Sequence, residues 1–226
     1  MLQLLLVSGA EVVVTGRDET ALNQLASAAQ GRVYPFAADL NDEQNRQALY
    51  ALCAAAGGID ILINNAGIQR RAPLEDFDAN DWHELMRVNL DGVFHVSQAV
   101  ARHMIGRGRG KIINICSVQS ELARPTIAPY AASKGAVKML TKGMCAEWAR
   151  HGIRVNAIEP GYIDTEMTDA MWDTDHGKAL IKRIPMRRLG KPEELNGLFL
   201  LFATEAGSWM TGACVPVDGG HLCSSL

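Results

Sequence analysis

Short β-branched runs alternate with longer helical segments along most of this chain, and this alternation constrains the fold more than any other feature. Strands are expected at residues 11–15, 33–37, 59–64, 111–116, 154–159 and 214–217. Helices are expected at residues 18–29, 41–56, 78–104, 129–151 and 192–203, with short helices between 161 and 190. Such alternation is typical of βαβ units, so we predict an α/β fold in which a doubly wound parallel sheet carries helices on both faces.

The composition of the chain narrows its class. Of 226 residues, 48% are hydrophobic and 21% are charged, which indicates a globular protein rather than a disordered one. No repeat, low-complexity tract or linker interrupts the sequence, so we expect one domain over residues 1–226. The net charge of −3 argues against nucleic-acid binding. The lack of an apolar run of about 18 residues argues against a membrane span.

Cysteine usage and the first residues bear on location. The five cysteines are scattered and form no Cys-x-x-Cys pair, which favours reduced thiols in the cytoplasm over disulfides or a metal site. Residues 1–7 are apolar but lack the basic start of a secretory signal. We interpret them as the last turns of a buried helix that stops near Gly9.

Small and polar residues follow the predicted strands, at the edge where open parallel sheets bind their ligands. The strand ends carry Gly16-Arg17, Asp39-Leu40, Asn64-Asn65-Ala66-Gly67, Ser117 and Pro160-Gly161. A ligand at this edge would touch backbone and side chains together, so we expect a binding crevice here.

Tyr130 and Lys134 lie four residues apart near the start of a predicted helix and therefore share one face. Ser117, at the end of the preceding strand, would face the same crevice. An ammonium beside a tyrosine stabilises the phenolate, so Tyr130 could exchange a proton with a substrate hydroxyl that Ser117 holds. Asn89 is a polar residue inside a long predicted helix, where asparagine is mildly unfavourable and needs a reason. The alternative is structural, a half-buried tyrosine beside a solvated lysine.

Four motifs occur in order: Asn64-Asn65-Ala66-Gly67, Ser117 with Tyr130-x-x-x-Lys134, Pro160-Gly161-x-Ile163-x-Thr165, and Val217-Asp218-Gly219-Gly220. Together they resemble the short-chain dehydrogenase/reductase family. Residues 114–122 and 130–141 resemble most closely its gluconate 5-dehydrogenase subfamily. The resemblance implies a Rossmann-like fold and an NAD(P)-dependent oxidoreductase. The reaction it implies interconverts a secondary alcohol and a ketone on a sugar acid or polyol, of the gluconate/5-ketogluconate type.

The resemblance also implies roles for individual residues. Tyr130 would be the acid/base and Ser117 the donor to the carbonyl oxygen. Lys134 would bind the nicotinamide ribose, and Asn89 would complete a proton relay through a water. Other residues implied in cofactor binding are Asp39, Leu40, Asn65, Ala66, Gly67, Pro160, Gly161, Ile163 and Thr165, beside Tyr130 and Lys134. Residues considered for substrate binding are Ser117, Gln119, Glu121 and Tyr130.

Arg17 bears on the choice between NADP and NAD. At this turn an acidic residue pairs with the ribose hydroxyls of NAD, whereas an arginine accommodates the 2′-phosphate of NADP. Gly16 takes the acidic position here and Arg17 follows it, which favours NADP. Two alternatives stay open: Arg17 is only a loop residue before the Asp18 helix cap, or the chain uses NAD, as some members of the subfamily do.

A sugar acid needs cationic partners for its carboxylate and hydrogen-bonding partners for its hydroxyls. Candidates lie in two loops, after the predicted strands at 59–64 and 111–116: Arg70, Arg71, Gln119, Glu121 and Arg124. Each is equally well explained as a solvated loop residue. By resemblance, helices 78–104 and 129–151 would pair across two-fold axes, so we expect a homodimer or homotetramer.

Family members begin with a strand, a glycine-rich turn and a helix that receives the cofactor pyrophosphate. No G-x-x-x-G-x-G occurs in these 226 residues, and residues 1–8 align with only the end of that helix. By average element lengths the missing piece is about 20 residues. The usual strand order places the missing strand between 11–15 and 59–64, so both would lose a neighbour. We therefore expect weak dinucleotide binding by these residues alone.

Three explanations of this N-terminal difference remain open. The sequence is a fragment of an ordinary enzyme, which we favour, or a truncated product that folds poorly and lacks activity. The third is a truncated, catalytically inactive dehydrogenase-like protein that acts only as an oligomer-forming or scaffold subunit. The complete set of Asn89, Ser117, Tyr130 and Lys134 argues against a pure scaffold, which has no need of it.

Overall fold

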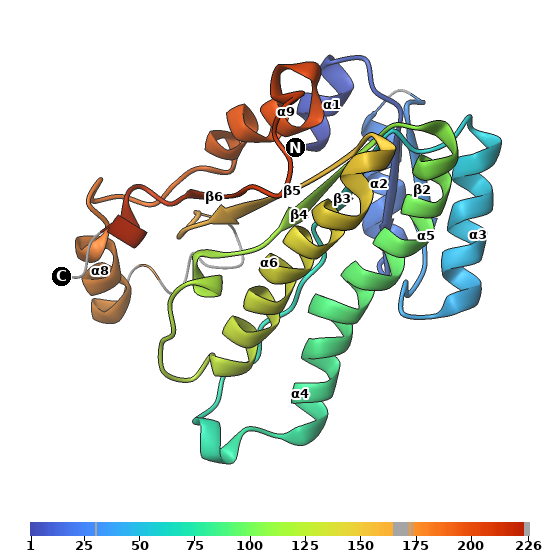
Figure 1. The fold of residues 1–226 in the computed structure, drawn as a ribbon. Coiled ribbons are helices and arrows are strands. Elements are labelled where there is room, and N and C mark those ends of the chain that lie inside the picture. The colour runs from blue at the N-terminus through green and yellow to red at the C-terminus, as the bar shows by residue number, and fades with distance from the viewer. Residues whose placement is uncertain (30, 165–171, 173, 224–226) are drawn as a thin grey trace.

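A computed structural model of the chain describes residues 1–29, 31–164, 172 and 174–223 (Figure 1). Its strands are β1 (Val12–Gly16), β2 (Val33–Ala37), β3 (Ile61–Asn64), β4 (Gly110–Ile115), β5 (Ile153–Pro160) and β6 (Cys214–Val217). Its α-helices are α1 (Leu2–Val7), α2 (Glu19–Ala28), α3 (Glu43–Ala55), α4 (Ala79–Met86), α5 (Gly92–Arg107), α6 (Ala128–Trp148), α8 (Asp175–Arg183) and α9 (Asn196–Ala203). The predicted alternation of strands and helices is confirmed.

All strand pairs are parallel, as predicted, and they form two sheets within the described residues. β1 pairs with β2, and the other strands follow the order β3-β4-β5-β6. In the part of the chain that the structure describes, no ladder joins β1 to β3. Each of these two strands therefore pairs on one side only, as the sequence led us to expect.

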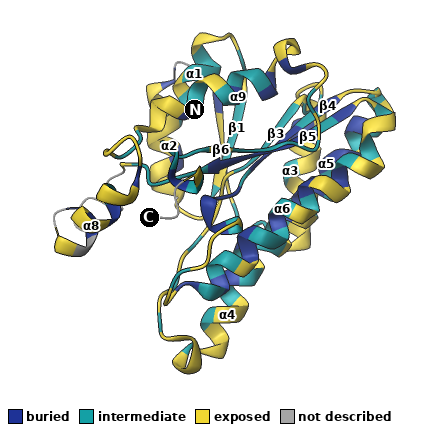
Figure 2. Cartoon of the chain, turned by 60° about the vertical axis from the view of Figure 1, so that its left-hand side comes forward, coloured by how far each residue is buried: buried dark blue, intermediate teal, exposed yellow. Residues whose placement is uncertain are grey.

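Helices cover both faces of the four-stranded sheet. Successive strand residues point to opposite faces, so neighbouring residues contact different helices. On one face Ile112 packs with Met104 of α5 and Met144 of α6. On the other face the next residue, Ile113, packs with Phe199 of α9. Figure 1 shows α5 and α6 side by side, with α9 beside α1 at the opposite side of the sheet. Figure 2 shows that the buried residues concentrate in β4, β5 and the helix sides that face them.

The single helix predicted over residues 78–104 is confirmed, and the structure adds one feature to it. Helical backbone runs without a gap through α4, a π-helical turn over Arg87–Asp91, and α5. Asn89 lies within the π-helical turn and is fully buried. π-helical turns inside helices are frequent at functional sites. The mid-helix asparagine, unfavourable in regular helix, thus lies where the helix changes its hydrogen bonding.

The first helix is less buried than predicted. α1 has no fully buried residue, and Val7 at its end is 82% exposed. Met1, Leu4 and Leu5 lie against the core cluster that contains Phe199 of α9. Only one side of α1 is therefore covered. Gly9 follows with a φ of 84°, the left-handed conformation that ends many helices, as predicted.

Candidate active site

Tyr130 and Lys134 lie in the first turns of α6, next to the carboxyl end of β4. The Lys134 ammonium lies 5.8 Å from the centre of the Tyr130 ring. Lys134 is 5% exposed, and its Nζ donates to the carbonyl oxygen of Ile115 at 2.7 Å. This bond fixes the ammonium beside the tyrosine, so the predicted shared face is present and points at the strand end.

Ser117 follows β4 and caps a short 3₁₀ helix over Val118–Ser120. Its Oγ accepts a hydrogen bond from the Gln119 backbone N–H at 3.1 Å, and its side chain lies near enough to Tyr130 to act on the pKa of the phenol. The hydroxyl is thus fixed in its own turn and lies next to the phenol. The structure brings Ser117, Tyr130 and Lys134 together, as predicted.

Burial governs the charge state of this site in the ligand-free protein. It raises the pKa of Tyr130, and the nearby Ser117 side chain opposes the rise only in part. Burial likewise lowers the pKa of Lys134. The net direction at Tyr130 is therefore upward, opposite to the lowering that the neighbouring ammonium alone would produce.

The Asn89 side chain is bonded to the loop that follows β3. Its Oδ1 accepts from the Ile68 backbone N–H at 2.8 Å, and its Nδ2 donates to the Ile68 carbonyl at 2.9 Å and to Ser133 Oγ at 3.1 Å. Both amide hydrogens are thereby used, which leaves one Oδ1 lone pair for a water. Asn89 thus ties this loop to α6.

The exposed backbone of Asn65, Ala66 and Gly67 runs past these side chains. A Cβ added to Gly67 would lie 3.5 Å from Asn89 Oδ1 and 3.6 Å from Lys134 Nζ. The glycine therefore leaves the polar groups of Asn89 and Lys134 open to a ligand lying along this strip. A buried ammonium next to exposed backbone fits the ribose hydroxyls of a nicotinamide cofactor.

Asp39 lies beyond the end of β2, where the adenine end of a dinucleotide would lie by resemblance. Its Oδ1 accepts from the backbone and the side chain of Asn41, both at 2.9 Å, and its Oδ2 lies 3.9 Å from an Arg87 nitrogen. The Asn41 backbone bond, with the charges of Arg87 and Arg17, lowers the pKa of Asp39. Arg17 is exposed yet close enough to act on this carboxylate, while Leu40 is partly buried against the core.

The segment after β5 packs closely against the C-terminal turn. A Cβ on Gly161 would lie 2.6 Å from the Cα of Asp218, so only glycine fits after Pro160. Ile163 forms an isolated bridge with Gly190. The predicted cofactor residue Thr165 lies outside the described residues.

The two substrate candidates after Ser117 differ in their surroundings. Gln119 is 7% exposed, and its Oε1 has no hydrogen-bond partner within the described part of the chain. Glu121 is exposed and forms an ion pair with Lys138. Gln119 is thus the candidate with an unmet hydrogen bond.

Arg71 and Arg124 lie in the loops that follow β3 and β4. Arg124 donates to the Tyr162 hydroxyl at 3.0 Å. Burial and the positive charge of Arg124 lower the pKa of Arg71, so the two guanidinium groups are electrostatically close. Arg70 instead bonds to Glu84 at 2.8 Å, which separates it from this pair.

Sequence reasoning missed three residues near Ser117, namely Ser120, Lys138 and the buried Glu159. Lys138 Nζ lies 3.0 Å from Glu159 Oε1, and Ser120 Oγ lies 2.7 Å from the same oxygen. A signal was present, because Glu159 is a carboxylate at the end of a predicted core strand and Lys138 follows Lys134 by one helical turn.

No helix in the part of the chain that the structure describes is long and apolar enough to cross a membrane. No group of three or more His, Cys, Asp or Glu side chains in these residues could hold a metal ion.

Comparison with known proteins gives consistent matches. A family model described as enoyl-(acyl carrier protein) reductase matches residues 3–221. Gluconate 5-dehydrogenase of Gluconobacter oxydans (strain 621H) is 51% identical over 221 residues, which cover 96% of this chain and 86% of that protein. The 5-keto-D-gluconate 5-reductase of Escherichia coli (strain K12) is 55% identical over 167 residues, 74% of this chain and 66% of that protein.

A solved structure resembles the whole chain. It is a gluconate 5-dehydrogenase from Burkholderia cenocepacia J2315 in complex with NADP and tartrate, with a TM-score of 0.91 and 50% sequence identity. The match covers 98% of this chain and 89% of that one.

Proposed function

Because the chain belongs to the short-chain dehydrogenase/reductase family of NAD(P)-dependent oxidoreductases, we propose that it interconverts gluconate and 5-ketogluconate with NADP. The observation that carries the proposal is the cluster of Ser117, Tyr130 and Lys134 beside the Asn65–Gly67 backbone. The substrate assignment is supported by the names of the relatives from Gluconobacter oxydans and Escherichia coli, and the cofactor by the NADP complex of the similar structure.

Each side chain of the cluster has a defined task in this reaction. Ser117 donates its hydroxyl hydrogen to the substrate oxygen, while one of its two lone pairs accepts from the Gln119 N–H. Tyr130 takes the hydroxyl proton during oxidation and returns it during reduction. Lys134 stabilises the phenolate and holds ribose hydroxyls. A bound nicotinamide ring supplies the chemistry these residues lack, the acceptance or return of a hydride.

We propose Arg17 as the residue that selects NADP. Arg17 directly follows β1. The position in which an acidic residue would bind the ribose hydroxyls of NAD is occupied by Gly16. A guanidinium there matches the dianionic 2′-phosphate, whereas NAD offers it only hydroxyls. Its exposure leaves the guanidinium accessible to a ligand.

Arg71 and Arg124 are proposed to bind the substrate carboxylate. Two like charges near each other are stabilised when an anion lies between them. The carboxylate of gluconate would supply that charge. The unmet Gln119 Oε1 would accept a hydrogen bond from a substrate hydroxyl.

The test follows cofactor reduction with D-gluconate and NADP. The 226 residues are assayed alone and joined to the part of the Gluconobacter oxydans relative that lies outside the match. We expect turnover in the joined protein, a loss of about a thousandfold in Tyr130→Phe, and little change in the control Tyr50→Phe, whose ring is exposed. Absence of turnover with every sugar acid and polyol, in folded protein, would contradict the proposal.

The carboxylate site has its own readout. Arg124→Met is expected to raise KM for gluconate about tenfold and to leave KM for an uncharged polyol unchanged. An equal rise for both substrates would show that Arg124 shapes the pocket without binding the carboxylate.

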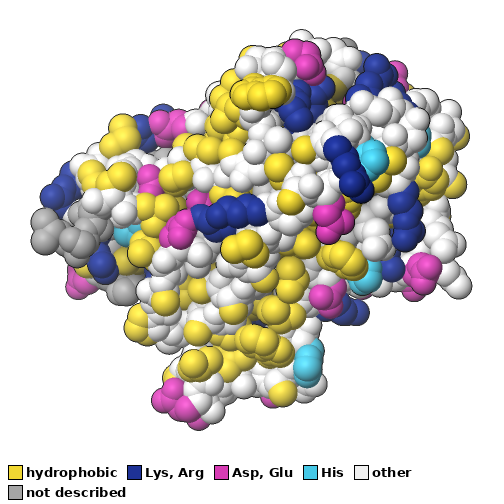
Figure 3. All heavy atoms as spheres, in the orientation of Figure 1, with side chains coloured by type: hydrophobic (Ala, Val, Ile, Leu, Met, Phe, Trp, Pro, Cys, Tyr) yellow, Lys and Arg dark blue, Asp and Glu magenta, His cyan; other side chains and the backbone are white. Residues whose placement is uncertain are grey.

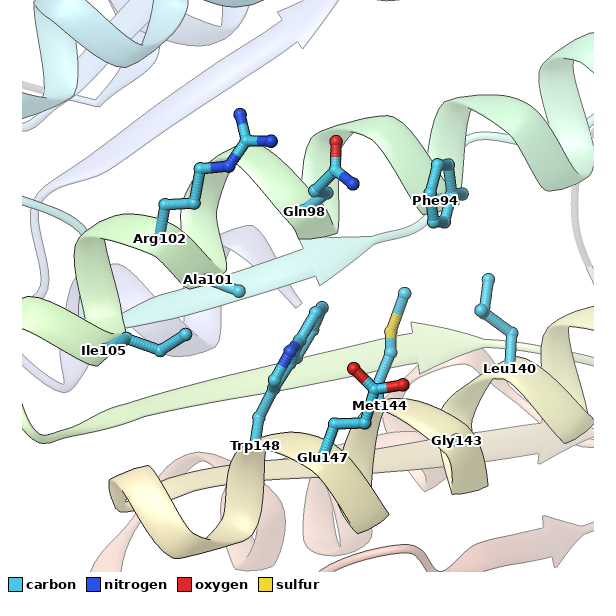
Figure 4. A pocket seen from close by; sticks show the side chains of 10 residues that line it. All are labelled: Phe94, Gln98, Ala101, Arg102, Ile105, Leu140, Gly143, Met144, Glu147 and Trp148. Carbon is cyan, nitrogen blue, oxygen red and sulfur yellow. The ribbon is translucent and has the colours of Figure 1, made fainter.

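We also propose that the chain forms a homo-oligomer through α5 and α6 and works in the cytoplasm. Phe94 and Met139 are 40% and 65% exposed, and hydrophobic side chains gather over these helices in Figure 3. A groove of about 310 Å³ runs between them (Figure 4). In Figure 4, Phe94 of α5 and Trp148 of α6 both point into it. The cytoplasmic location is supported by the five cysteines, all free thiols.

A further inference from the structure

Glu159 is a buried carboxylate that the proposed reaction does not use. It lies at the carboxyl end of β5, and its side chain is 1% exposed. Removing a carboxylate from water is costly unless charged or hydrogen-bonding partners compensate. Lys138 Nζ at 3.0 Å and Ser120 Oγ at 2.7 Å both reach Glu159 Oε1.

Lys138 extends this contact to the turn after Ser117. It lies on α6, one helical turn after Lys134, and its ammonium also pairs with Glu121. Lys138 is therefore held between a strand-end carboxylate on β5 and a second carboxylate at the far end of the Ser117 turn. The cation bridges β5, α6 and this turn.

Ser120 connects Glu159 to Ser117 itself. Ser120 Oγ also lies 2.7 Å from the Ser117 carbonyl oxygen, so its single hydroxyl hydrogen is shared between that oxygen and Glu159 Oε1. The Ser120 backbone N–H donates to the same carbonyl oxygen at 2.9 Å. The pairing of β4 with β5 ends before this point, since its last backbone bond runs from Cys116 N–H to the Ile158 carbonyl at 2.8 Å. Beyond Cys116 the turn is held by its own bonds, by the burial of Val118, and by its contacts with Glu159 and Lys138.

We propose that Glu159 is a positioning residue. With Lys138 and Ser120 it clamps the Ser117 turn to the end of β5 and so fixes where the Ser117 hydroxyl meets Tyr130 and the substrate oxygen. The kinetic part of this inference rests on the proposed function. A displaced Ser117 hydroxyl stabilises the transition state less well. Cofactor binding changes little, because other residues hold the cofactor.

The experiment compares three substitutions with two matched controls. Glu159→Leu keeps similar volume and removes both bonds, Glu159→Gln keeps an acceptor oxygen, and Ser120→Ala removes the link to Ser117. The controls are Glu205→Gln, at an exposed ion pair with Lys111, and Ser27→Ala, whose hydroxyl bonds the Asn23 carbonyl on α2. Every substitution is assayed in the joined protein described above. Hydrogen exchange is measured at the amides of Ser120, Glu121 and Leu122.

We expect Glu159→Leu and Ser120→Ala to lower kcat about tenfold while KM for NADP stays unchanged. Glu159→Gln should recover most of the lost kcat, and the controls should match wild type. The three turn amides should exchange faster in Glu159→Leu and Ser120→Ala than in the controls. A kcat within about twofold of wild type in both variants would overturn the inference.

The exchange measurement separates this inference from the proposed function. If wild-type protein turns over no sugar acid, the proposed function fails, and the exchange rates alone decide on the clamp. Unchanged exchange at the turn amides in Glu159→Leu would then overturn it.

Discussion

Burial raises the pKa of Tyr130, whereas the proposed oxidation requires a lower one. Burial favours the neutral phenol in the ligand-free protein, whereas oxidation of an alcohol requires the phenolate as base. The positive charge of an oxidised nicotinamide ring would favour the phenolate when it is bound nearby. We therefore expect Tyr130 to ionise more readily when an oxidised cofactor is bound.

This leads to a prediction for the ligand-free protein. A difference titration of tyrosinate absorbance, wild type minus Tyr130→Phe, should show a midpoint above the ordinary value of 10. Above pH 10 or so the unfolded chain releases this proton before the folded chain does, so Tyr130 should also make stability fall as pH rises. A midpoint below 10 would mean that Lys134 outweighs burial.

Spacing alone was enough to predict part of the cluster. Tyr130 and Lys134 lie on one helix, so their contact follows from helical geometry. The contact between Glu159 and Ser120 could not be predicted in this way, because it depends on how β4 and β5 pair and on the turn after Cys116. The upward pKa of Tyr130 was also missed, since burial is a property of the packed molecule.

Among the elements, the π-helical turn between α4 and α5 is explained most clearly, by the bonds of Asn89. The π-helical turn places Asn89 inside, where it bonds both backbone groups of Ile68. The sequence marked the position through an unfavourable residue but gave no sign of the extra residue in the turn. Hydrophobic periodicity predicts the presence of a helix. It does not predict where the hydrogen bonding within that helix changes.

The exposed faces of α5 and α6 give a prediction at this scale. Phe94→Glu places a charge in the groove of Figure 4 and should dissociate an oligomer built on these helices. Sedimentation velocity would show a smaller species than for wild type. Leu74→Glu is the matched control, because Leu74 is also exposed, at 63%, but lies outside both helices. An unchanged sedimentation coefficient in Phe94→Glu would place the interface elsewhere.

For the whole molecule, the division into two sheets is the main architectural result. The parallel order and the unpaired sides of β1 and β3 were predictable from the order of elements and the resemblance. The partial exposure of α1 was not, because the apolar run of residues 1–7 reads alike whether one side or all sides are covered. The Tyr130 cluster lies on the four-stranded sheet, whose strands β4 and β5 form the buried centre.

We propose that this site oxidises one particular alcohol of gluconate. The product is identified by carbon-13 NMR after the joined protein has reacted with labelled D-gluconate and recycled NADP. We expect a ketone signal at carbon 5 and none in the Tyr130→Phe sample. A ketone at another carbon, or turnover that persists without the Tyr130 hydroxyl, would contradict it.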